Sequence, residues 1–473
     1  MAGAAMLAAS PLRADDLRQA LELAYRTNPQ LEAARAQQRA VDEGVPIARS
    51  AQLPSIAGTA AYTEFVKKSS DSSVSPDRAF SAGVDVSVPI FAGGAIKNSI
   101  RAAETRVKAG QQDLRGTESD VFTQVVAAYM DVILGQAIVG LNRSNIQVLD
   151  VNLQATRDRF QIGDLTRTDV AQSGARLAVA RSQTRTAESN LIAARERYIQ
   201  VVGKPPVNLQ PPPPLPGLPA TAEEAVQTAL ESNPDLEAAR QRSRAAGYDT
   251  NVAGAGRLPR VSVFTGADYS DYLGSLGGPS IPPGSISQRS TAATAGVRAT
   301  IPIFQGGLPA AQERQAQARE GATLENEIAI ERQIVAGVRT AFAQWKSAND
   351  VITSSQTGVD AATLSLEGVR AENTVGNRTI LDILNAEQEL LNAQVQLVTA
   401  RRNAYVAGFN LLATMGKADA LDLGLDGGPL YDPMTNYNRV KGKIWDWAKD
   451  PDPVAKSTRT VDTPAQDGSI PPS

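Results

Sequence analysis

The side chains of this 473-residue chain that could do chemistry are carboxylates and guanidinium groups, because the sequence includes no histidine and no cysteine. A serine triad, a histidine general base, a thiol nucleophile and nearly every zinc site therefore lose their usual residue. Arg378 and Asp382 stand four residues apart behind Gly376. On a helix this spacing gives an ordinary surface ion pair worth about a few tenths of a kcal/mol. We expect no enzyme, no cofactor and no metal ion.

Composition also limits the partners and the compartment. The formal net charge is −3, so no basic field attracts nucleic acid. No run of eighteen apolar residues occurs, so we expect no membrane-spanning helix. Residues 1–14 look like the remnant of a secretory signal peptide cleaved after Ala14, or else a cloning remnant or frayed terminus. An exported protein without cysteine suits the envelope of a Gram-negative bacterium.

The two halves of the chain are copies of one unit. NPQLEAAR at Asn28–Arg35 returns as NPDLEAAR at Asn233–Arg240, and VPIFAGG at Val88–Gly94 returns as IPIFQGG at Ile301–Gly307. The offset grows from 205 to 213 between these motifs, which places eight extra residues in the Gly/Pro/Ser-rich loop Leu273–Gln288.

This duplication divides the chain into segments. They are the signal remnant 1–14, a first repeat 15–203, a Pro-rich linker 204–220, a second repeat 221–416 and a C-terminal extension 417–473. Consecutive prolines favour an extended polyproline II linker. The extension is rich in Pro, Asp, Ser and Thr towards its end, so we expect it to be partly disordered.

Each repeat predicts a hairpin of two strands. Apolar and polar residues alternate over 80–90 and 293–301, with weaker alternation over 56–62 and 261–269. Strands of about ten residues can cross a bilayer when tilted. In each main strand one face is apolar, while the other carries Asp85 or Arg298.

The two faces allow two interpretations. In a soluble sandwich the apolar face would pack on a core, whereas in a membrane barrel it would face lipid around a polar lumen. Four strands cannot close a barrel, which needs about eight, and a membrane sheet with open edges is not viable. A barrel must therefore be shared by several chains, with Val86 and Val297 facing lipid and Asp85 and Arg298 facing the lumen.

Long helices follow the hairpins. The strands close at a proline and the chain turns at a pair of glycines, which are Pro89, Gly93, Gly94, Pro302, Gly306 and Gly307. A helix over Ala95–Gln161 would be about 100 Å long. A returning helix over Leu165–Val202 carries a heptad pattern of apolar and alanine positions, which is typical of a coiled coil. A third helix is predicted over Pro29–Gln52. Laid end to end, this helix and the returning helix would nearly equal the length of the helix over Ala95–Gln161.

Strand hairpin, long helix, glycine turn and heptad helix, all duplicated over about Asp16–Lys417, resemble the TolC family of outer-membrane efflux proteins. The matching segments are Asn28-Pro29, Val88–Gly94, Gly163–Val170, Asn233-Pro234, Ile301–Gly307 and Val375–Leu384. The resemblance implies a mixed α and β fold. Three chains would share a twelve-stranded transmembrane barrel and a tunnel of twelve helical columns in the periplasm.

The resemblance also implies a site. The periplasmic gate would include Asp169 and Arg378, which hold the entrance closed, and an acidic ring at Asp382. Well-studied members carry a second aspartate at the position of Asn385, so the second acidic ring is neutral here. They also carry a tyrosine at the position where this chain has Asn373. The adaptor would contact the turn tips at Gly163, Asp164, Leu165, Thr166, Gly376, Asn377, Arg378 and Thr379. A plainer interpretation makes Asp164 and Asn377 helix N-caps.

The implied function is passive conduction across the periplasm and the outer membrane. Its partners would be two further copies, a periplasmic adaptor, an inner-membrane ABC or other transporter, and outer-membrane lipid. The expected cargo is protein, as in type I secretion, with drugs or other small molecules as the alternative. A soluble periplasmic coiled-coil scaffold is the remote alternative, but a scaffold has no reason to carry strands long enough for a bilayer.

Overall fold

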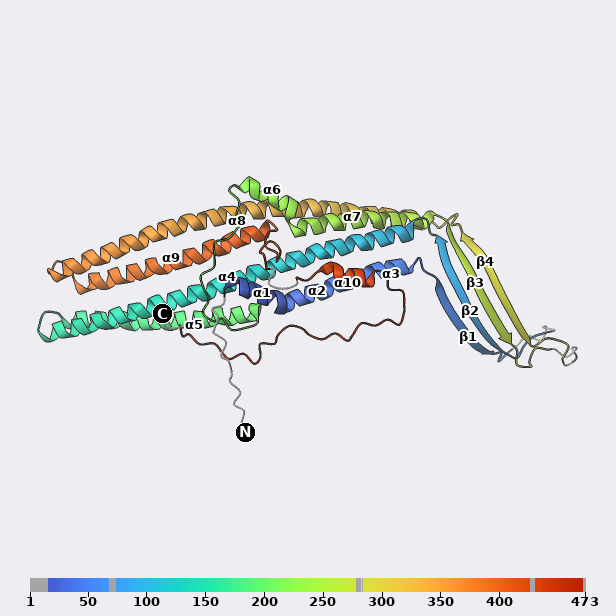
Figure 1. The fold of residues 1–473 in the computed structure, drawn as a ribbon, viewed down its shortest axis with the longest axis horizontal. Helices are drawn as coiled ribbons and strands as arrows, with labels where there is room; N and C mark the ends of the chain where they lie inside the picture. The colour runs from blue at the N-terminus through green and yellow to red at the C-terminus, as the bar shows by residue number, and fades with distance from the viewer. Residues whose placement is uncertain (1–15, 68–73, 278–281, 283, 426–429, 471–473) are drawn as a thin grey trace, which may run out of the picture.

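The computed structural model describes residues 16–67, 74–277, 282, 284–425 and 430–470, so the signal remnant predicted at 1–14 lies outside the described residues. The molecule is elongated, with a wall of long helices and a four-stranded sheet at one end (Figure 1). This confirms the mixed α and β fold and places the strands at one extremity of the helical wall.

The sheet is antiparallel and follows chain order. Its strands are β1 (Ser55–Glu64), β2 (Arg78–Phe91), β3 (Arg260–Asp271) and β4 (Arg289–Thr300), and neighbours in this order are hydrogen-bonded. All four predicted strands are therefore confirmed. β1 and β4 each pair with one strand only among the described residues, which leaves two open edges.

The register divides the side chains of the sheet into two faces. Val86 stands opposite Ile56 on β1 and Thr265 on β3, whereas Asp85 stands opposite Ala57 and Gly266. Directly opposed residues share a face. Valines, alanines and three aromatic residues gather with Val86, and mostly serines, glycines and charged residues gather with Asp85. The aromatic residues of the apolar face are Tyr62, Phe80 and Tyr269.

The helical wall consists of four columns. The two long helices, α4 (Ala95–Gln161) and α8 (Leu308–Thr374), have 67 residues each. α4 contacts the returning helix α5 (Arg167–Val202) on one side, and the second returning helix α9 (Ile380–Thr414) on the other. α9 in turn contacts α8, so α5 and α8 lie at the two edges of the wall (Figure 1).

Shorter helices complete two of the columns. α2 (Pro29–Asp42) and α3 (Gly44–Ser50) continue the column of α5, and α7 (Pro234–Gly254) with a 3₁₀ turn (Ala255–Arg257) continues the column of α9. The short helices α1 (Leu17–Thr27) and α6 (Ala222–Ser232) pack against α4 and α8 respectively. The single helix predicted over 29–52 is wrong, since it divides after Asp42. Pro46 has no N–H for the carbonyl of Asp42, and its ring crowds that carbonyl.

The repeated Asn-Pro motif joins two helices end to end. The Asn28 side chain accepts from the N–H groups of Gln30 and Leu31 at 2.9 and 3.4 Å, and its amide donates to the carbonyl of Val201 at 2.9 Å. Asn233 caps α7 in the same way and donates to the carbonyl of Thr414 at 2.9 Å. Each asparagine therefore fastens the start of one helix to the C-terminal end of the returning helix.

The heptad positions of α5 form the seam against α4. Leu177, Thr184, Leu191 and Tyr198 are all buried, as the coiled-coil pattern predicts. Contrary to our expectation from apolar runs, one stretch of α4 is apolar enough to span a membrane, with a mean hydropathy of 1.6. In the described structure 39% of this stretch is buried. α4 contributes Phe122 and Tyr129, which have no exposed surface, to the main core.

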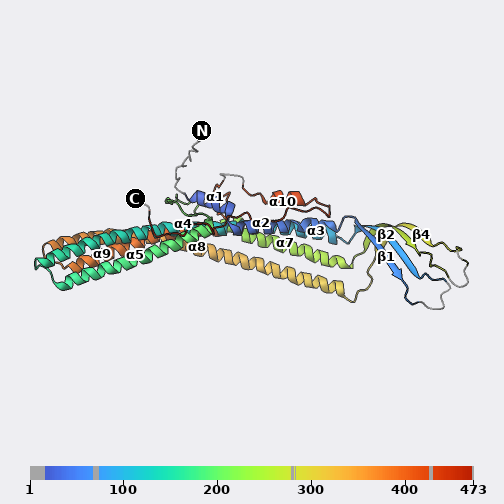
Figure 2. The ribbon, with the colours of Figure 1, turned by 90° about the horizontal axis from the view of Figure 1, so that it is seen from below.

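The C-terminal extension, part of which we expected to be disordered, contacts the helical wall at several of its described residues. Its helix α10 (Pro433–Val440) packs on α2, where Asn436 donates to the buried Asp42 at 2.8 Å. Glu118 of α4 accepts from the N–H of Ala420, and burial raises the pKa of Glu118 to about 7. Figure 2 shows α1 and α10 on the same side of the helical wall. Composition alone missed these contacts because they are long-range.

Candidate functional site: the turns of the two helical hairpins

The candidate site lies at the end of the wall away from the sheet, where α4 turns into α5 and α8 into α9 (Figure 1). Gly163 and Gly376 both have φ of +84°, a left-handed conformation that glycine adopts without strain. Asp164 and Asn377 follow them but are not the N-caps we considered. The N-cap of each returning helix lies two residues later and is a threonine, Thr166 or Thr379, and the helices begin at Arg167 and Ile380.

The two N-caps are identical capping boxes. Asp169 accepts from the backbone N–H and the hydroxyl of Thr166 at 2.8 and 2.7 Å, and Asp382 accepts from Thr379 at 2.9 and 2.8 Å. Each threonine hydroxyl oxygen in turn accepts from the aspartate's own N–H at 3.3 Å. These hydrogen bonds hold the pKa of both carboxyl groups below the usual range. Asp169 and Asp382 thus occupy corresponding positions and stay ionised.

Each turn is also closed by an ion pair. In the first repeat the positive charge lies on the long helix and the negative charge in the turn, and in the second repeat the two are exchanged. Arg159 at the end of α4 pairs with Asp164, with its Nη2 2.6 Å from Oδ2. Glu372 at the end of α8 accepts from Nε of Arg378 at 2.6 Å. This contact raises the pKa of Arg378, with a smaller contribution from Asp382. Arg378 therefore pairs with Glu372 rather than with Asp382, the partner that the four-residue spacing suggested.

Asn373 and Asn385 also have partners. Asn373 donates its side-chain amide to the carbonyl of Arg378 at 2.7 Å, which braces the turn. Asn385 of α9 accepts from Nη2 of Arg176 on α5 at 2.7 Å. Beside it, Leu384 is buried against residues of α4 and α5, including Leu149 and Leu177. The second hairpin is therefore fastened to the first through α9.

The sequence could not single out Arg176, because it belongs to no repeated motif. Conversely, no hydrogen bond or ion pair joins Asp169 to Arg378 within the described part of the single chain. The structure brings each of them to a hairpin turn, but each is engaged inside its own hairpin. No cluster of three or more potential metal ligands occurs among the residues that the structure describes.

Comparisons with known proteins support one family. The family model described as outer membrane efflux protein matches residues 20–204 and 225–417. The chain is 33% identical to the outer membrane efflux protein BepC of Brucella suis, over 92% of both chains. It is 26% identical to the outer membrane protein TolC of Escherichia coli, covering 87% of this chain and 84% of TolC.

Further similarity extends to a secretion protein and to a solved channel. The chain is 25% identical to the alkaline protease secretion protein AprF of Pseudomonas aeruginosa, over 85% of each. The crystal structure of the Campylobacter jejuni CmeC outer membrane channel has the same fold, with a TM-score of 0.75 and 18% identity over 90% of this chain and 89% of that one. With its duplicated halves both matched, this chain belongs to the outer membrane efflux protein family, the TolC-like channels that its motifs resemble.

Proposed function

We propose that three copies of this chain form one duct that passively conducts exported cargo from an inner-membrane transporter and a periplasmic adaptor across the outer membrane. The observation that carries the proposal is the four-stranded sheet, with an apolar face, a polar face and open edges on β1 and β4. Open edges cannot face lipid, so β4 of one copy must pair with β1 of the next. Three copies then give a barrel of twelve strands.

The helical wall supports the same closure. α4 and α8 are duplicates of equal length, yet α4 has twenty buried residues and α8 has five. Large apolar side chains of α8 remain exposed in the single chain, namely Leu308, Leu324, Ile328, Val351 and Leu364. Because α8 and α5 lie at opposite edges of the wall, α8 of one copy can pack beside the α5 column of the next.

The cargo that we propose is protein, exported as in type I secretion. The similarity to AprF, a protein named for the secretion of a protease, favours this cargo. Small molecules are the second candidate, favoured by the higher identity to BepC, a protein named for efflux. Both cargoes use the same passive duct, so the choice changes the transporter and the adaptor but not the role of this chain.

The assembly and the cargo have separate tests. Light scattering in detergent, with the detergent subtracted, should give three times the chain mass of 49.9 kDa. A folded monomer would contradict the shared barrel. In cells from which the gene is deleted, loss of an extracellular protein with unchanged drug susceptibility supports secretion. Sensitisation to a drug panel with normal secretion supports efflux instead.

The same proposal assigns the gate to the hairpin turns. Three copies of Asp382 surround a narrow axis, while Asp169, Arg378 and Asn385 hold the neighbouring hairpins. The adaptor contacts the tips, Gly163–Thr166 and Gly376–Thr379. Support comes from the exposed carboxylates, held ionised by their capping boxes, and from the Arg176–Asn385 contact between hairpins.

The duplicated capping boxes provide a matched pair of variants for the acidic ring. Asp382→Asn keeps an oxygen that accepts from Thr379 but removes the charge, and Asp169→Asn makes the same change in the first repeat. Removing a ring charge should reduce cation selectivity and block by multivalent cations in planar-bilayer recordings of Asp382→Asn. Asp169→Asn should leave both unchanged, because it leaves the Asp382 ring intact; as part of the contacts that hold the entrance closed, it should act on the resting conductance instead. Equal behaviour of the two variants would make Asp382 only a helix cap.

A further inference from the structure

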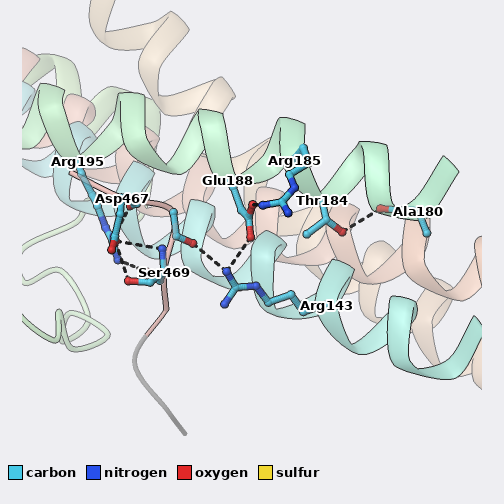
Figure 3. A network of polar contacts seen from close by, with 9 residues as sticks. Arg143, Ala180, Thr184, Arg185, Glu188, Arg195, Asp467 and Ser469 are labelled. Carbon is cyan, nitrogen blue, oxygen red and sulfur yellow. Dashed lines mark hydrogen bonds and ion pairs between the residues drawn. The ribbon is translucent and has the colours of Figure 1, made fainter. Parts of the chain in front are cut away.

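The last described residues of the chain lie against α4 and α5, far along the sequence from either helix (Figure 3). The surface that they contact is formed by Gly140, Arg143, Glu188 and Arg195 and is named the α4–α5 groove. Arg195 of α5 is buried and donates to the carbonyls of Asp467 and Ser469 at 2.6 and 2.7 Å. Arg143 of α4 donates to the carbonyl of Gly468 at 3.2 Å. Three successive carbonyls are therefore recognised by two arginines from two helices.

The groove also selects side chains. A Cβ at Gly468 would lie 2.7 Å from Cβ of Glu188, so only glycine fits there. Asp467 accepts from the N–H and the hydroxyl of Ser469 at 3.1 and 2.7 Å, which sets the turn. Ile470 packs against the main core beside Gly140. These contacts specify an Asp-Gly-Ser-Ile segment that bends at Gly468.

Both flanks of the segment are fastened as well. Glu188 is held by Arg143 at 2.7 Å and by Arg185 at 2.9 Å, which keeps the wall of the groove in place (Figure 3). Glu196 accepts from the N–H of Gln466 at 3.1 Å. Charge-assisted hydrogen bonds to a partly buried guanidinium are stronger than neutral ones. Each of the four residues of the segment, and Gln466 before it, thus contacts α4 or α5.

Between α10 and this groove the extension crosses the junction where α5 ends and α2 begins. Thr458, Thr460 and Thr463 line one cleft with residues of that junction, which are Thr27, Pro29, Val201 and Gly203. A Cβ at Gly203 would lie 2.8 Å from Oγ1 of Thr458. The same junction is bridged by Asn28, so the extension lies directly over the break in the column.

We propose that residues 450–470 act as a strap, whose Asp-Gly-Ser-Ile end is recognised by a peptide-binding groove on α4 and α5 of the same chain. One end of the strap is held on α2 through α10, and the other on α5, so it splints the break between the two helices. This role is independent of the cargo and of the gate.

The cysteine-free chain allows a direct test of docking. Cysteine replaces Ile470 in the full-length chain, and the rate of maleimide labelling is compared with that of a Val461→Cys chain, whose site is 84% exposed. Docking predicts slow labelling of residue 470. Adding Arg195→Ala or Gly468→Ala should speed it by about tenfold, the equivalent of losing 1.4 kcal/mol of docking free energy. If the Ile470→Cys chain is labelled as fast as the Val461→Cys chain, or if neither added variant changes the rate, the proposal that the groove binds this segment is overturned.

A matched control is Arg181→Ala, one turn earlier on α5. Arg181 pairs with Asp150, its side chain is 62% exposed, and it has no described contact with Glu188 or the strap, so its loss should leave the labelling rate unchanged. Cross-linking a chain that carries both Gly140→Cys and Ile470→Cys with a short bis-maleimide tests whether the strap docks on its own chain or on a neighbouring copy. Linked peptides within one chain support the proposal, and a covalent dimer overturns it.

The splint itself has a second readout. Hydrogen exchange of the last turn of α5, before Gly203, should accelerate in Gly468→Ala, because the strap no longer covers the junction. If labelling accelerates while this exchange stays the same, the strap docks but does not splint the column, and that part of the proposal fails.

Discussion

Val86→Arg is expected to lower the free energy of unfolding in the membrane by about 2–4 kcal/mol per chain. Val86 lies midway along β2, on the face that it shares with Ile56 and Thr265. Apart from charged residues at the strand ends, such as Asp271 and Arg289, this face is mostly apolar across the four strands, and in the proposed barrel it meets hydrocarbon. A guanidinium there loses its hydration without gaining a partner. Denaturant titration of the protein in phospholipid vesicles measures the change.

Ser87→Arg is the control, because the next residue along a strand lies at nearly the same depth on the opposite face. Ser87 stands opposite Phe264, on the face that carries Asp85 and Arg298. An arginine at this position reaches the polar interior, so we expect a loss below about 1 kcal/mol. Equal losses at the two positions would mean that the sheet packs as a soluble sandwich, the alternative that the alternating pattern left open.

Asn28→Ala is expected to lower the free energy of unfolding by about 2–3 kcal/mol. The side chain is 4% exposed and serves two helices at once, as N-cap of α2 and as donor to the carbonyl of Val201. Alanine removes the cap and leaves that carbonyl without its donor. Asn233→Ala should behave similarly, because Asn233 repeats the cap and donates to Thr414. Denaturant unfolding in detergent provides the measurement.

Asn28→Asp separates the two roles. Aspartate caps a helix as well as asparagine does, but a carboxylate cannot donate to the carbonyl of Val201 and is repelled by it. We therefore expect Asn28→Asp to lose about 1–3 kcal/mol although the cap is kept. Asn377→Ala is the control: Asn377 is exposed and caps no helix, so the change should stay within about 0.5 kcal/mol. Full stability of Asn28→Asp would show that the bridge between the helices contributes nothing.

Local patterns were sufficient to predict the strands and the long helices. The alternation around Val86 predicted the strands and their faces, because a period of two survives in any pleated sheet. The heptads from Leu177 to Tyr198 predicted the seam of α5 against α4, because a 3.5-residue repeat on a long helix must meet a partner. Repetition of the Asn-Pro motif marked both junctions. Its mechanism, a cap that also bridges two helices, required the positions of Val201 and Thr414.

Contacts distant in sequence were decided only by the tertiary structure. The spacing of Arg378 and Asp382 suggested a pair, but the turn brings Glu372 closer to the guanidinium and leaves Asp382 to cap its own helix. Arg176 reaches Asn385 across 209 positions, which no local pattern can encode.

The C-terminal extension shows the same limit most clearly. Its polar composition predicts a chain that cannot bury enough apolar surface to fold alone. It is ordered because α4 and α5 already present fixed arginines to its carbonyls, so only the extension loses conformational entropy on docking. The sequence by itself therefore determined the repeats, the strands and the long helices, but not the division of 29–52 into two helices. The surface formed by the packed helices decided where the extension lies.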